Sequence, residues 1–94
     1  MIHIMVRHKV EDFTKWKAAF DAGSQMRAAA SSVKGHIFRD AGDPSIVTVL
    51  SHFDDAEQAQ AFVQSPDMLK AVEASGVIGE PEVFFFGYEE KYVD

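Results

Sequence analysis

Apolar residues recur at every second position at the start of the chain and at helical spacing soon afterwards. In residues 2–8, Ile2, Ile4 and Val6 alternate with other side chains, which predicts a strand with two different faces. Asp12 can cap a helix. The stripe that follows at helical spacing consists of Phe13, Trp16, Phe20, Gly23 and Arg27. We therefore predict one helix that ends near residue 31 or 32.

The rest of the chain predicts a hairpin, a divided helix and a last strand. Residues 35–40 and 46–53 have strand character, and a turn with Gly and Pro joins them into an antiparallel hairpin. A helix begins at Asp54 and Asp55 and begins again at Ser65 and Pro66, because Ser caps a helix and Pro suits its first turn. It stops at Gly76, and the last strand covers residues 83–88 before a charged tail.

The order βαββαβ predicts a single α+β domain over residues 1–94. Right-handed βαβ connections then give a four-stranded antiparallel sheet with both helices on one face, which is the ferredoxin-like layout. Phe84 and Phe86 alternate with Val83 and Phe85, so the last strand is apolar on both faces. We expect the uncovered face to form a homodimer by sheet-to-sheet packing. The alternative is that the tail, residues 88–93, covers these aromatic side chains.

Charge and composition narrow the functions open to such a domain. Nine Lys and Arg against fifteen Asp and Glu give a net charge of −6 and a pI near 5.0, which opposes binding to nucleic-acid phosphates. The sequence has no cysteine, which excludes disulfides and thiolate metal sites and is compatible with a reducing compartment. The first apolar run is too short for a secretory or membrane segment. We expect a cytoplasmic protein without nucleic-acid or membrane partners.

Six segments carry a family resemblance, namely residues 2–6, 13–20, 35–40 and 47–59, Ser65-Pro66-Asp67, and the segment 76–79. Together they resemble the dimeric α/β-barrel superfamily, which includes antibiotic-biosynthesis monooxygenase-like domains, polyketide-cyclase-like proteins and muconolactone isomerases. The resemblance implies a ferredoxin-like dimer with a cleft between helices and sheet. It also implies oxygenation of an aromatic polyketide without an added cofactor, in which the substrate itself activates oxygen.

The chain departs from this family pattern at two places. Relatives often carry a Glu and a Trp or Tyr at the end of the third strand, where this chain has Ser51-His52-Phe53. They often carry a His in the following helix, where this chain has Phe62. No catalytic residue is therefore transferred from the family to this sequence.

His52 is the candidate for proton transfer from the residues themselves. It falls at the end of the third strand, beside the expected mouth of the cleft, and the near-neutral pKa of histidine suits acid–base work. The alternative is a packed or interfacial histidine. The four histidines are scattered singly without ligand spacing, so we expect no metal site.

Arg27 is the candidate ligand clamp, because it follows the aromatic stripe and its guanidinium can hold a carboxylate or phenolate. The alternative is an arginine that reaches solvent or pairs with Asp40 or Glu73. The residues expected to line the cleft are Trp16, Phe20, Phe38, Phe62 and Met68, which can equally be plain core. The segment 76–79 is either a lid over the cleft or the stop of the helix.

Three functions follow from these features. The first is a small homodimeric enzyme, a cofactor-independent monooxygenase, cyclase or isomerase, that binds an aromatic or polyketide-like molecule. The second is a non-catalytic, ligand-binding or stress-associated homodimer. A purely structural oligomerisation module with a filled cleft is a third. The first two differ in whether a titratable group is placed in the cleft.

Overall fold

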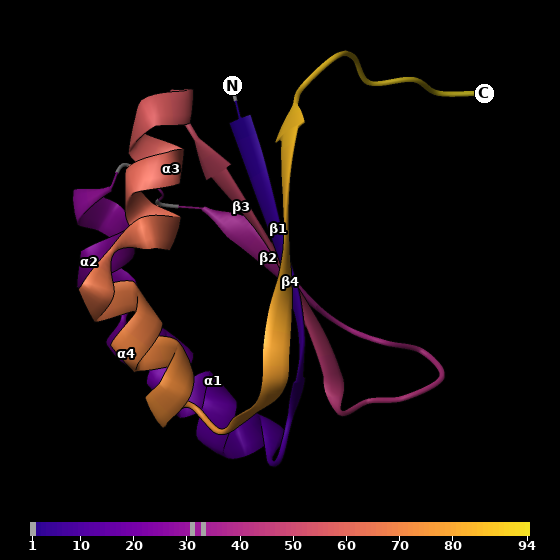
Figure 1. Ribbon diagram of the computed structural model, residues 1–94. Coiled ribbons are helices and arrows are strands. Elements are labelled where there is room, and N and C mark those ends of the chain that lie inside the picture. Colours follow the sequence, from indigo (N-terminus) through magenta and orange to yellow (C-terminus); the bar gives the residue numbers. More distant parts are fainter. Residues whose placement is uncertain (1, 31, 33) are drawn as a thin grey trace.

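Four strands form one antiparallel sheet, and all the described helices lie on one side of it (Figure 1). The computed structural model describes residues 2–30, 32 and 34–94. The strands are β1 (Ile2–Val10), β2 (Gly35–Arg39), β3 (Ile46–Phe53) and β4 (Val77–Gly87). The helices are α1 (Phe13–Ala22), α2 (Ser24–Ala29), α3 (Ala56–Gln64) and α4 (Pro66–Ala74). The strand order β2-β3-β1-β4 confirms the predicted ferredoxin-like α+β fold.

Short polar side chains begin three of the helices where the sequence predicts. The Asp12 carboxylate accepts hydrogen bonds from the backbone N–H groups of Thr14 and Lys15 at the start of α1. Asp55 accepts one from the N–H of Gln58 at the start of α3. Ser65 caps α4 in the same way, with Pro66 in the first turn. These bonds satisfy backbone donors that a helix start otherwise leaves unpaired.

The predicted first helix is in fact two helices divided at Gly23, so the prediction of one helix is wrong. The N–H of Gly23 bonds back to the carbonyl of Phe20, which closes the end of α1 with a tight turn. Glycine is the weakest helix former after proline, which explains the break at this position. The second helix ends at Ala29, and Ser31 lies outside the described residues.

The last strand begins at Val77 rather than at residue 83. Val77 and Ile78 pair with Val10 and Lys9, and the register then shifts before β4 pairs with the rest of β1. The segment 76–79 is therefore not a lid, because most of it is hydrogen-bonded sheet. Gly76, with a φ of +83°, follows the end of α4, which agrees with the alternative that this segment is the stop of the helix. The sequence did not predict this start because it contains Gly79 and Pro81. Glycine and proline are rare in strands except at edges and irregular pairings.

The core lies between the helices and the inner face of the sheet. One buried cluster consists of Ile4, Val6, Phe53 and Ala59, and the other consists of Val10, Trp16, Val47 and Val49. Every strand residue in these clusters comes from β1 or β3, the two central strands. The described helices include none long and apolar enough to cross a membrane.

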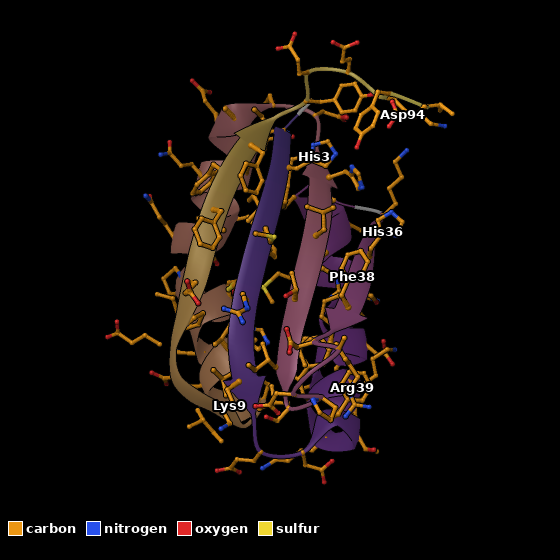
Figure 2. All side chains as sticks on the ribbon, turned by 90° about the vertical axis from the view of Figure 1, so that its right-hand side faces the viewer. His3, Lys9, His36, Phe38, Arg39 and Asp94 are labelled. Atoms are coloured by element: carbon orange, nitrogen blue, oxygen red, sulfur yellow. The ribbon has the colours of Figure 1, made fainter. Side chains whose placement is uncertain are left out.

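The other side of the sheet, which we call the outer face, carries no helix (Figure 1). The pairing of β1 with its neighbours places His3 and Met5 on this face, opposite Phe86 and Phe84. Phe84 and Phe86 stack on each other and are 39% and 45% exposed. The tail does not cover them, because it leaves the sheet at the end that carries His3 (Figure 2) and its Tyr92 is itself 79% exposed. The prediction of an uncovered apolar face is confirmed, and the alternative of a covering tail is wrong.

Replacing Gly35 with alanine is expected to destabilise the fold by about 2 kcal/mol. An added Cβ would overlap the carbonyl oxygen of Leu50 on β3, a backbone atom that cannot turn aside. Gly87→Ala is the control, because nothing lies within 4 Å of the Cβ that it adds. Chemical denaturation of both variants gives the free energies of unfolding. Equal values would contradict this close approach of β2 to β3.

Candidate functional site

An apolar cavity of about 100 Å³ lies between the sheet and the helices. Its sheet side is formed by residues of β1 and β3, among them Ile4, Val6, Val49 and Phe53. Residues of all four helices close the other side, among them Trp16, Met26, Phe62 and Met68. A pocket of this lining takes a flat apolar ligand, with the few polar groups deciding its orientation.

A second hollow of about 430 Å³ adjoins this cavity beside α2 and β2. The two hollows share Phe20, Arg27, Val49 and Ser51. The second hollow is more polar, with Ser24, Gln25, Lys34 and His36 among its lining residues. A ligand with an apolar ring and a polar substituent therefore has two adjoining environments available.

Five of the predicted ligand-binding residues line the cavity, and one does not. The five are Trp16, Phe20, Arg27, Phe62 and Met68. Phe38 instead lies on the outer face beside His36 (Figure 2), since its pairing partner Thr48 belongs to the outward positions of β3. The expected placement of Phe38 in the cleft is therefore wrong. Ligand binding by the other five stays a prediction.

The aromatic side chains of α1 form a row, of which Trp16 and Phe20 line the cavity. The rings of Trp16 and Phe20 stack with centroids 5.2 Å apart, and Phe13 continues the row 5.7 Å from Trp16. At the side of this row, the His8 ring lies 5.5 Å from Trp16. Aromatic rings at such distances favour a further flat ring against their faces or edges.

Arg27 packs on Phe20 at the end of this aromatic row and lines both hollows. Its guanidinium carbon lies 3.7 Å from the centroid of the Phe20 ring, and Nη1 donates a 2.6 Å hydrogen bond to the carbonyl of Phe20. The expected alternative of an ion pair with Asp40 or Glu73 is wrong, since neither pair forms among the described residues, and the side chain is half-buried. Burial lowers the pKa of Arg27, which the charge of Asp21 partly offsets. The group nevertheless remains charged at neutral pH, so it can receive an anionic substituent.

His8 is a cavity residue that the sequence analysis missed. Its side chain is 7% exposed, and neither ring nitrogen has a hydrogen-bond partner among the described residues. Burial lowers the pKa of His8, which keeps the ring neutral. An unpaired buried polar group costs about 1–3 kcal/mol, so its presence here needs a reason. The alternation of Ile2, Ile4 and Val6 was the available signal, because it extends to residue 8 on the same face.

His52 does not lie beside the cavity, so its expected position is wrong. It faces the outer side of β3, opposite His3 in the sheet, with the two rings 4.2 Å apart. On the neighbouring strand β2, the ring centroid of His36 lies 5.9 Å from that of His52. His3 and His36 are labelled on this face in Figure 2. Burial first, and then the charges of His3, Lys34 and His36, lower the pKa of His52. No group of three or more potential ligand residues within the described ranges fits a metal ion.

The sequence profile of the antibiotic biosynthesis monooxygenase family matches residues 1–74. The chain belongs to this family. Among curated proteins, none matches the sequence. This family member shares its fold with SnoaB, a cofactor-independent oxygenase from Streptomyces nogalater, at 12% identity and a TM-score of 0.78, over 99% of this chain and 97% of that one.

Two further solved structures have a fold similar to that of this antibiotic biosynthesis monooxygenase family member. A family protein from Bordetella bronchiseptica has 15% identity and a TM-score of 0.76, over 98% of this chain and 97% of that one. One from Deinococcus radiodurans has 10% identity and a TM-score of 0.75, over 100% of this chain and 98% of that one. At such low identities the fold is shared, and the chemistry of the site depends on the residues of each chain.

The free energy of unfolding of this family member is expected to decrease as the pH is lowered from about 8 to about 5. Burial lowers the pKa of His8 below the value of 6.5 that it regains on unfolding. The stabilisation by the neutral ring is therefore present above about pH 6.5 and is lost as the pH falls through the folded pKa. His8→Leu should raise the stability at neutral pH and flatten this dependence, since it removes both unpaired nitrogens.

Met5→Leu is the matched control, because Met5 lies on the outer face of the same strand and does not titrate. Urea unfolding of the three proteins across this pH range compares their slopes. A His8→Leu variant that keeps the full pH dependence would show that the buried ring is not its source.

Proposed function

We propose that this protein is a cofactor-independent oxygenase that binds a hydroxylated aromatic, polyketide-like molecule in the cavity. The observation that carries the proposal is the aromatic-lined cavity between sheet and helices in a member of the antibiotic biosynthesis monooxygenase family. The similar fold of SnoaB, described as a cofactor-independent oxygenase, supports the same class of reaction. Trp16, Phe20, Phe62 and Met68 are the proposed contacts to the ring.

The proposed reaction requires no redox-active group on the protein. A phenol supplies the electrons, O₂ accepts them, and the products are a quinone and one water molecule. The protein contributes by holding the ring in an apolar space that excludes bulk water, where charge on the ring oxygen responds strongly to nearby groups. Arg27 is the proposed partner for an anionic substituent, at the border of the more polar hollow.

Filling the cavity should abolish binding of aromatic molecules. Ala71 lines the cavity from α4, so Ala71→Phe places a ring in the space that the ligand would occupy. Ala74→Phe is the control, since Ala74 lies exposed on the same helix. We expect at least a tenfold loss of affinity for a hydroxylated naphthalene or anthracene in Ala71→Phe and no loss in the control, measured by the fluorescence of the single tryptophan. Equal affinities in both variants would place the ligand elsewhere.

Oxygen uptake separates the oxygenase from a ligand-binding protein. We expect the wild-type protein to consume O₂ with a polyhydroxylated aromatic substrate and without added flavin, nicotinamide or metal. A non-catalytic binding protein is the second candidate. The placement of His52 outside the cavity favours it, whereas the presence of His8 in the cavity favours the oxygenase. Tight binding with no oxygen uptake across a series of such substrates would decide for this second candidate.

The second part of the proposal is a homodimer formed through the outer face. Its support is the exposure of Phe84 and Phe86 on a sheet face without helices, because such apolar patches usually mark an interface. In a sheet-to-sheet dimer these rings would pack against the partner's apolar side chains.

Replacing Phe84 and Phe86 together by glutamate should convert a dimer into a monomer or an aggregate. The two carboxylates would have to be buried unpaired in the interface, which is strongly unfavourable. Tyr92→Glu is the control, since this aromatic residue of the tail is also exposed. Light scattering coupled to size-exclusion chromatography measures the mass of each variant. A double variant that remains a dimer would refute this interface.

A further inference from the structure

We propose that His8 recognises the ligand of the cavity by accepting a hydrogen bond from a hydroxyl group on an aromatic ring. The cavity would thus select phenols over hydrocarbons of the same shape. This inference rests on the proposed binding function and adds the residue that determines specificity. It follows from the position of His8 and from the groups around it.

The first argument is the place of His8 in the sheet. It lies on β1, in register with the fully buried Val47 of β3 and within the set of residues that line the cavity. The Trp16 ring lies beside it, with centroids 5.5 Å apart. A ring that packs along the row of Trp16 and Phe20 would therefore bring its edge to the histidine.

The second argument is that two other polar side chains of the cavity already donate to backbone carbonyls, while Ser51 lies where the cavity borders the second hollow. The hydroxyl of Ser75 donates to the carbonyl of Val72, and the guanidinium of Arg27 donates to the carbonyl of Phe20. Both nitrogens of His8, in contrast, lack a hydrogen-bond partner within the described part of the chain. Because buried polar groups are almost always paired, a bound ligand is the natural partner for this one.

The third argument concerns the chemistry of a neutral imidazole. One nitrogen is a bare acceptor and the other is a donor, and no charged side chain is a cause of the shift that keeps the ring neutral. A phenol donates its O–H to the bare nitrogen. A hydrocarbon leaves both nitrogens unpaired. The hydroxylated aromatic ring is therefore the ligand that pairs with this buried acceptor.

The test compares phenol and toluene as probes of the wild-type protein, of His8→Leu and of Met5→Leu. Toluene is more apolar than phenol, so the decisive quantity is the change between variants in the ratio of their dissociation constants. We expect His8→Leu to shift this ratio about tenfold in favour of toluene, which corresponds to the loss of one hydrogen bond. The outer-face variant Met5→Leu should leave the ratio unchanged, because Met5 lines neither hollow.

A second measurement needs no variant and follows the imidazole nitrogens of His8 by NMR in the wild-type protein. Phenol should shift the resonance of the acceptor nitrogen, and toluene should not. If toluene and phenol both bind but neither the ratio nor the resonance responds, His8 does not recognise the hydroxyl, while binding in the cavity stands. If no probe, including larger hydroxylated rings, binds to the wild-type protein, the cavity function and this inference both fall.

Discussion

Side chains alternate along β1, and both the cavity and the outer face depend on that alternation. This strand is paired on both sides, to β3 and to β4, so its register fixes which residues of three strands share a face. Ile4, Val6 and His8 point toward the helices, and His3 and Met5 point away from them. A slip by one residue would exchange the two sets and place the apolar positions of the strand on the wrong side.

The helical layer shapes the cavity through interruptions rather than through regular packing. The break at Gly23 ends α1 just after Phe20, and the turn lets Arg27 fold back onto that phenylalanine. A second interruption at Ser65 divides α3 from α4, and Phe62 and Met68 reach the cavity from either side of it. A single straight helix over each βαβ crossover would present its side chains along one line instead of around a hollow.

The histidines illustrate how one residue type takes two roles on the two faces of a sheet. His3, His36 and His52 come from three strands and meet on the outer face, where burial first and then the neighbouring charges lower the pKa of His52. His8 lies alone on the inner face, where burial has the same effect on its pKa. The first arrangement suits a surface that packs against another neutral surface, and the second suits a binding cavity that discriminates between ligands by one hydrogen bond.

The sequence by itself determined the order of the elements, their caps and the uncovered face, because these depend on local spacing and on short polar residues near helix starts. It also determined most of the cavity's aromatic lining, since Trp16, Phe20 and Phe62 lie on the apolar stripes of their helices. The tertiary structure alone decided which face His52 and Phe38 occupy, because a strand that is apolar on both sides carries no sign of which side the helices cover. It also decided that His8 has no partner, since hydrogen bonding in a cavity depends on elements that are distant in the chain.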